Sequence, residues 1–159
     1  MPTTLSPDHL LQHATLATPL FTLRDRTFVA KCVKCYDADS IHVVILLHDV
    51  PTRFRCRLLG IDTPELRGKT PAERQHARRA REYLREHIHN KLVHIVCGDF
   101  DKYGRLLVWV HPLEDTHAVG GGGGNLSYAN SWNETLVDKG YACKYDGGKK
   151  TPYAEWATV

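Results

Sequence analysis

The order of strand and helix signals along the chain constrains its fold more than any other feature. Three short runs rich in β-branched residues come first, at Thr27–Tyr36, Ile41–His48 and Thr52–Gly60. A helix signal follows, and then two further strand runs, Lys91–Cys97 and Arg105–His111. This order is no alternation of single strands and helices, which argues against a parallel sheet of β-α-β units. We therefore predict an α+β fold, a five-stranded Greek-key β-barrel of the OB type, antiparallel and closed or nearly closed, with two to three packed helices.

The third strand run alternates in a way that is typical of a half-buried strand. Its apolar face comprises Phe54, Cys56 and Leu58, and its charged face comprises Arg53, Arg55 and Arg57. Turns are expected on either side of the second run, at Asp37–Asp39 and at Asp49–Pro51. Gly60 can bend the chain after the third run and re-aim the residues that follow.

The helix signal between the third and fourth strands is strong. Thr70 suits the N-cap, Pro71 suits the first turn, and Glu73 is placed to complete a capping box. The helix is expected to run to about His89. Its apolar stripe has helical spacing and comprises Ala77, Ala80, Leu84 and Ile88. Arginines lie off this stripe, where a solvated helix face is the ordinary interpretation.

The segments at both ends of the barrel are less regular. Residues 1–26 are predicted to be an N-terminal extension with a short helix over Asp8–His13, and residues 27–159 the folded domain. Pro112–Gly124 is expected to be a flexible loop, and its five terminal glycines fit either a natural insertion or an artificial linker. Ser127–Lys139 predicts a further helix that Gly140 ends.

Composition limits the class of protein without defining its function. A chain of 159 residues is long enough for one hydrophobic core, and a net charge of +3 permits a polyanionic partner. The start of the sequence lacks a basic region followed by an apolar core, so we expect no signal peptide. No apolar run reaches the roughly 18 residues that a membrane span needs. Its five cysteines lack the spacing of a disulfide scaffold. We expect an intracellular (cytoplasmic) or intravirion protein with reduced thiols and no membrane partner.

Charged residues gather at the end of the third strand run, where an ordinary strand end needs none. Asp62 and Glu65 follow Arg57 closely, and Asp39 precedes the neighbouring strand, so all four are expected at one edge of the barrel. Two aspartates offer hard oxygen ligands for Ca²⁺ or Mg²⁺, and a nearby glutamate can act as a base on water. Arg57 and Arg105 supply planar charged forks for a phosphate. The same residues also suit surface ion pairs and a capped turn, and their spacing does not decide between these interpretations.

Two segments resemble a known family when they are taken together. RLLGIDTPE, at Arg57–Glu65, and DKYGRLLVWV, at Asp101–Val110, are similar to the two main motifs of the staphylococcal nuclease family. The upstream YDADS, at Tyr36–Ser40, resembles that family's Asp-Gly-Asp-Thr turn, with Ala38 in place of its Gly. A positive φ at Ala38 would be unfavourable. The resemblance covers roughly residues 28–145 and implies the five-stranded barrel already predicted.

The resemblance also implies a role for each matching residue. Asp39 and Asp62 would bind the metal with their carboxylates and Thr63 with its carbonyl, while Glu65 would be the general base. The implied phosphate-binding residues are Arg57 and Arg105. The implied substrate-binding residues are Lys102, Tyr103 and, in looser register, Tyr145, for which packing is the alternative. The implied activity is Ca²⁺-dependent hydrolysis of DNA and RNA, with Mg²⁺ as the alternative ion; we expect a monomer that prefers single-stranded substrate.

Two other functions compete with this interpretation. Nuclease-like barrels also occur as domains that bind nucleic acid or protein without cleaving, although such domains typically lose the acids or arginines that this chain keeps. Cys32-Val-Lys-Cys35 offers the second alternative, a zinc or redox site. A single CxxC is weak evidence for such a site, and in a regular strand Cys32 and Cys35 would point to opposite faces. We expect ordinary strand cysteines.

Overall fold

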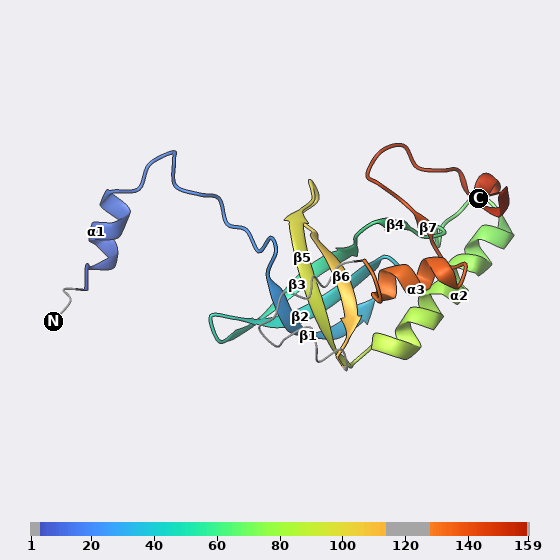
Figure 1. Ribbon diagram of the computed structural model, residues 1–159, viewed down its shortest axis with the longest axis horizontal. Coiled ribbons are helices and arrows are strands. Elements are labelled where there is room, and N and C mark those ends of the chain that lie inside the picture. Colours follow the sequence, from blue (N-terminus) through green and yellow to red (C-terminus); the bar gives the residue numbers. More distant parts are fainter. Residues whose placement is uncertain (1–3, 114–127, 159) are drawn as a thin grey trace.

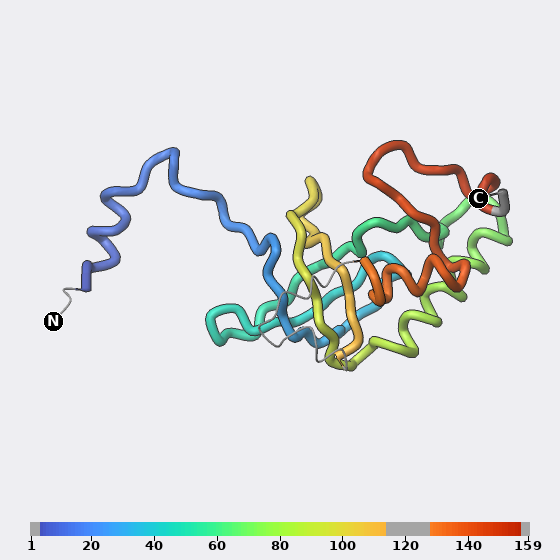
Figure 2. Tube along the Cα trace, in the orientation of Figure 1, coloured from blue at the N-terminus to red at the C-terminus, as the bar shows by residue number. Residues whose placement is uncertain are grey.

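The computed structural model describes residues 4–113 and 128–158 (Figures 1 and 2). Most of the predicted glycine-rich loop at Pro112–Gly124 lies outside the described residues. Five strands form a closed barrel in the order β1-β2-β3-β6-β5. Their bounds are Thr27–Cys35 for β1, Ser40–Leu47 for β2, Val50–Leu58 for β3, Leu92–Phe100 for β5 and Leu106–Pro112 for β6. The predicted five-stranded OB-type barrel is confirmed.

One seam of the barrel differs from the prediction of an antiparallel barrel. β3 and β6 run parallel over Cys56–Leu58 and Leu106–Val108, while the four other strand pairs are antiparallel. Two strands can pair in parallel only when a long connection returns the chain to its starting end. The α2 helix and β5 provide that connection here. The prediction missed this seam because the residue pattern of a strand does not indicate whether it pairs parallel or antiparallel with its neighbour.

The β2–β3 turn begins one residue earlier than predicted and is shorter. Leu47 pairs with Val50, so the hairpin loop consists of His48 and Asp49 alone. Both residues have positive φ, at 49° and 63°, as a type I′ hairpin turn requires. The predicted turn at Asp49–Pro51 was therefore right for Asp49 and wrong for Val50 and Pro51, which already belong to β3. The alternation of β3 is confirmed, with Cys56 and Leu58 facing the core.

The helices follow the local signals closely. The α2 helix spans Pro71–Ile88, with Thr70 as the N-cap, and packs against β1. Its predicted stripe of Ala77, Ala80, Leu84 and Ile88 is buried. The α3 helix spans Trp132–Asp138, a shorter range than predicted, and packs against β6. Gly140, with φ of +79°, follows its end.

The predicted orientation of Cys32 and Cys35 was wrong. The β1–β2 register shifts between Cys32 and Lys34, so one extra residue bulges on β1. The bulge turns Cys35 to the same face as Cys32, and the two buried sulfur atoms lie 3.8 Å apart. All five cysteines are free thiols.

The chain returns to the barrel at its C-terminal end. The short strand β4, at Ile61–Asp62, pairs antiparallel with β7, at Cys143–Lys144. A loop then leads to the 3₁₀ helix η2 at Tyr153–Thr158, and Figure 1 shows this loop arching above β4. The pairing brings the segment after α3 beside the end of β3. No sequence signal indicated this small second sheet.

The N-terminal segment is divided between a buried anchor and an exposed helix. The α1 helix, at Pro7–Gln12, has no buried residue, and Figure 1 shows it away from the barrel. Leu23, in contrast, is fully buried in the core. Within residues 4–113 and 128–158, no helix combines the length and apolarity that crossing a bilayer requires.

Candidate active site

Arg57 and the two aspartates meet at one edge of the barrel. Ser40 pairs with Arg57 in the β2–β3 register, which places Asp39 beside the arginine. Arg57 Nη1 donates to Asp39 Oδ2 at 2.7 Å, and Nη2 lies 3.8 Å from Asp62 Oδ1. A single guanidinium therefore contacts both carboxylates, and the predicted grouping of these three residues exists in the fold.

Gly60 sets the direction of the acids that follow β3. Its φ of +76° is one that residues with a Cβ rarely adopt, and it redirects the chain from β3 into β4. Asp62 and Thr63 are consequently buried rather than exposed on a turn. Tyr145 N–H donates to the Gly60 carbonyl at 2.9 Å, which ties the C-terminal segment to the same bend.

The turn before β2 carries two coupled carboxyls. Burial and, to a lesser degree, the neighbouring Asp39 charge together raise the pKa of Asp37 to about 7. Burial also opposes ionisation of Asp39, but hydrogen bonding to Asp37 and the charge of Arg57 hold its pKa below the ordinary value. Asp39 is thus the member of the pair that ionises at the lower pH. Ala38 does not adopt positive φ, so replacing a glycine there causes no backbone strain.

Glu65 differs from the aspartates in being exposed. Its side chain keeps 65% of its accessible surface, while that of Asp62 keeps 8%. A buried carboxylate suits the binding of a fixed cation, whereas an exposed one can reach water. The two kinds of acid that the sequence predicted therefore occupy different environments.

Arg105 is held by the turn that precedes it. Asp101 Oδ1 accepts from the N–H groups of Tyr103 and Arg105, and Asp101 Oδ2 accepts from Arg105 Nε at 2.8 Å. Gly104, with φ of +79°, permits this tight turn. Lys102 Nζ and Arg105 Cζ lie 5.2 and 5.5 Å from the centre of the Tyr103 ring. The predicted substrate residues Lys102 and Tyr103 are thus grouped with Arg105.

Lys150 reaches the acids from the C-terminal loop. Its Nζ lies 3.1 Å from Asp62 Oδ1 and 3.9 Å from Glu65 Oε1. Tyr145 lies beside it, with both Lys150 Nζ and Arg57 Cζ 5.9 Å from the ring centre. Gly147, with φ of +94°, allows the turn between Tyr145 and Lys150. The sequence prediction missed Lys150, and this glycine turn after Tyr145 is the signal that it overlooked.

Two adjoining cavities surround the arginines. One of about 360 Å³ is lined by eight of the nine predicted site residues, and also by Asp37, Ser40 and Lys150. The ninth residue, Asp62, lines a larger cavity of about 900 Å³. The predicted site residues in the smaller cavity are Asp39, Arg57, Thr63, Glu65, Lys102, Tyr103, Arg105 and Tyr145.

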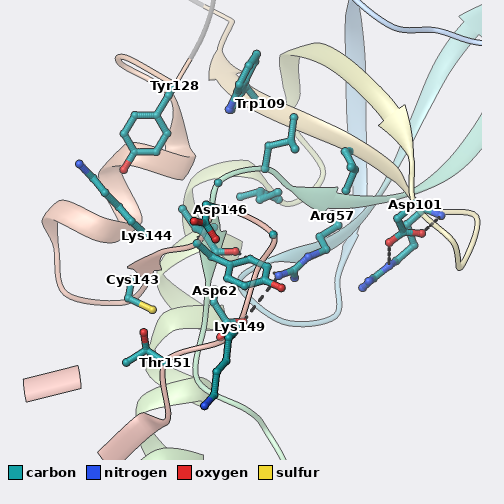
Figure 3. Close-up of a pocket in the computed structure, with 18 residues that line it drawn as sticks. Arg57, Asp62, Asp101, Trp109, Tyr128, Cys143, Lys144, Asp146, Lys149 and Thr151 are labelled. Atoms are coloured by element: carbon teal, nitrogen blue, oxygen red, sulfur yellow. Dashed lines mark hydrogen bonds and ion pairs between the residues drawn. The ribbon is translucent and has the colours of Figure 1, made fainter. Parts of the chain in front are cut away.

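The larger cavity joins the charged site to an apolar one. Arg57, Arg105 and Tyr145 line both cavities, whereas Leu107, Trp109 and Tyr128 line only the larger of the two. Figure 3 shows Trp109 and Tyr128 toward one end and Arg57 and Asp62 toward the other. The two arginines thus lie between the smaller, polar cavity and the aromatic part of the larger cavity. The sequence prediction did not include Trp109 or Tyr128.

Comparison with known families agrees with this geometry. The family model described as "Staphylococcal nuclease homologue" matches residues 55–157, more than half of the chain. The chain belongs to the staphylococcal nuclease homologue family. The match includes every predicted site residue except Asp39, which precedes it. A search of curated proteins gives no match.

For a member of this nuclease-type family, the remaining question is whether the acids suit a metal ion. Asp39, Asp62 and the Thr63 carbonyl are hard oxygen donors of the kind that Ca²⁺ and Mg²⁺ prefer. Asp62 Oδ1 is buried and makes no hydrogen bond within the described residues, although Lys150 Nζ lies near it. No group of three or more His, Cys, Asp or Glu side chains in those residues forms a metal site. A cation here would therefore need backbone and water ligands in addition to the two aspartates.

Proposed function

We propose that this protein is a metal-dependent nuclease that hydrolyses phosphodiester bonds of DNA and RNA as a monomer. The observation that carries the proposal is the gathering of both arginines, both aspartates and Glu65 around two adjoining cavities. Family membership alone does not establish activity, because function depends on the site rather than the fold. Here the acids and cations that the chemistry requires lie at one edge of the barrel.

The arginines would bind the scissile phosphate. Arg57 and Arg105 line both cavities, so a phosphate between them would meet two guanidinium groups. Charged N–H donors gain strength as negative charge grows on the phosphoryl oxygens in the transition state. Asp101 orients Arg105 through Nε, which leaves the Nη atoms of Arg105 for the substrate.

Glu65 would accept the proton of the attacking water. Its exposed carboxylate lines the same cavity as the arginines, as a base beside the phosphate must. Asp39, Asp62 and the Thr63 carbonyl would hold the divalent cation, for which we propose Ca²⁺, with Mg²⁺ as the alternative. When bound, that cation would stabilise charge on the phosphoryl oxygens.

The larger cavity favours single-stranded substrates. Tyr128, Trp109 and Tyr145 provide aromatic surface beside the arginines, and unpaired bases stack on such surfaces. A base within a duplex would have to leave its stack before it could enter. We therefore propose that this cavity takes a base next to the scissile phosphate, with Lys102 and Tyr103 contacting the substrate at the smaller cavity.

One observation favours a second function. Lys150 places a cation beside Asp62 and Glu65, the acids that the nuclease would need for its metal and base. A lysine that stayed there would leave a domain that binds nucleic acid without cleaving it. This alternative keeps the arginines and the aromatic cavity as a binding surface.

Digestion of single-stranded DNA and RNA by the wild type and Glu65→Gln, each with Ca²⁺, Mg²⁺ or EDTA, tests the proposal. We expect cleavage that requires metal and that falls about 10²- to 10⁴-fold in Glu65→Gln, because the base is lost. Glu86→Gln, an exposed change on α2, should cleave like the wild type. Cleavage in EDTA, or full activity of Glu65→Gln, would contradict the mechanism. Tight binding without cleavage by folded wild type would establish the binding domain instead.

A further inference from the structure

Glu73 is a buried carboxylate that the proposed chemistry does not use. It lies in the first turn of α2 with 9% of its surface exposed. The capping-box prediction for Glu73 was wrong in its second half. Thr70 Oγ1 does accept from Glu73 N–H at 3.1 Å, but the Glu73 carboxylate turns toward the loop before the helix. The short connection between Glu65 and the helix brings that loop within its reach.

The two oxygens of Glu73 bind both ends of the loop. Oε1 accepts from the Glu65 N–H at 3.3 Å, and Oε2 accepts from the Lys69 N–H at 3.2 Å. Hydrogen bonds to a charged acceptor are stronger than those between neutral groups. Because one side chain holds the first and last residues of the segment, displacing Glu65 would break a bond to a buried charge.

Gly68 makes room for this contact. A Cβ built on Gly68 would overlap the Glu73 carboxyl group, so only glycine permits the close approach. The loop has further fixed points, because Gly68 N–H donates to the Glu65 carbonyl and Arg74 Nη1 donates to the Gly68 carbonyl. The Glu73 carboxyl group thus packs directly against Gly68 of the loop at residues 65–69.

The Glu65 backbone is therefore anchored while its side chain stays in solvent. The Glu65 N–H donates to the buried Glu73 carboxylate, whereas the Glu65 side chain is 65% exposed. We propose that Glu73 is a positioning residue, which fixes the backbone of Glu65 and so sets where its carboxylate stands relative to the two arginines. This inference rests on the proposed nuclease function. Glu73 touches no reacting atom.

A positioning role predicts a specific kinetic change. Glu65 would act on water in the transition state and would add little to substrate binding, which the arginines provide. Misplacing such a group by about 1 Å can lower a rate by about 10²-fold. Glu73→Gln should therefore lower kcat by about 10- to 100-fold while KM stays near the wild-type value. The reason is that the side-chain amide in Glu73→Gln has one oxygen that can accept a loop N–H, while its nitrogen cannot accept the other.

The test combines kinetics with backbone amide exchange measured by NMR. In Glu73→Gln we expect faster exchange at the Glu65 or Lys69 amide together with the selective loss of kcat. Glu86→Gln, the same change at an exposed position of α2, should alter neither quantity. Wild-type exchange or wild-type kcat in Glu73→Gln would overturn the inference. A rise in KM with unchanged kcat would also overturn it.

A second pair of variants keeps the test decisive if Glu73→Gln folds poorly. Gly68→Ala should lower kcat in the wild type, since the added Cβ displaces the Glu73 carboxyl. In a Glu73→Ala background the same change should cost little more, because no carboxyl remains to be displaced. Additive losses in this cycle would overturn the pairing. Failure of the wild type to cleave would overturn the nuclease function and the catalytic role of the anchor, while amide exchange would still report whether the anchor exists.

Discussion

Arg57 is the residue around which the candidate site is arranged, because its guanidinium contacts Asp39 and Asp62 at once. Its side chain is 13% exposed, so these charges interact in a setting that water screens weakly. Removing Arg57 would leave two buried carboxylates without their shared partner, which is costly in a folded protein. A change at Arg57 would therefore test stability as well as phosphate binding.

Substitution of Lys150 tests metal binding without changing any of the proposed metal ligands. Its ammonium group lies where a divalent cation on Asp62 would be repelled by it. Lys150→Met should therefore bind Ca²⁺ severalfold more tightly than the wild type, as measured by calorimetry without substrate. Lys149→Met removes an equal charge from the same loop and serves as the control. Equal or weaker Ca²⁺ binding by Lys150→Met would show that the lysine does not compete with metal.

At the scale of elements, α3 is joined to the barrel at its parallel seam. Asn133, in the first turn of α3, accepts from the Val110 N–H and donates to the carbonyls of Leu59 and Val108. Leu59 follows the last residue of β3 that pairs with β6, where the ladder ends and backbone groups need other partners. One buried side chain thus closes the end of the seam beside the site.

Asn133→Leu should lower the free energy of unfolding substantially. The substitution leaves the buried Val110 N–H without the Asn133 acceptor and the Leu59 carbonyl without its Asn133 donor, while the Val108 carbonyl keeps the Leu59 N–H. We expect a cost of about 3 kcal/mol. Urea unfolding at neutral pH measures this loss. Asp138→Ala, an exposed change at the end of the same helix, should have little effect. A small change in Asn133→Leu would mean that water or backbone shifts satisfy the exposed groups.

At the scale of the whole molecule, the N-terminal segment has two physically different parts. The α1 helix buries nothing, and its leucines at positions 10 and 11 are exposed. Residues 25 and 26, in contrast, exchange backbone hydrogen bonds with Cys97 of β5, and Leu23 is buried in the core. The barrel therefore depends on the end of this segment and not on its helix.

Truncation and substitution should separate these two parts. Deleting residues 1–20 should leave the urea midpoint of the domain unchanged, because none of the described residues it removes is buried. Leu23→Ala in the full chain should cost about 2 to 5 kcal/mol, as is usual for emptying a buried leucine site. A large loss on deletion would show that residues 1–20 stabilise the barrel by contacts other than burial.

The sequence by itself determined the features that depend on neighbours along the chain. The order of Arg57, Asp62 and Glu65 along the chain is given by the sequence directly. The capped start of α2 follows from helix-capping chemistry, and the alternation of β3 follows from the strand period. These forces act over a few residues, so a pattern in the chain records them. The order of strands and helices was likewise enough to predict the barrel.

Only the tertiary structure decided which distant groups meet. Three such cases are the parallel pairing of β3 with β6, the bulge that places Cys32 beside Cys35, and the approach of Lys150 to Asp62. In each case the local sequence pattern does not indicate which residue will be the neighbour. Glu73 is the clearest case, because its sequence position fits a capping box equally well. Its carboxylate binds the loop instead, since the N–H groups of Glu65 and Lys69 lie within its reach and Gly68 leaves the space.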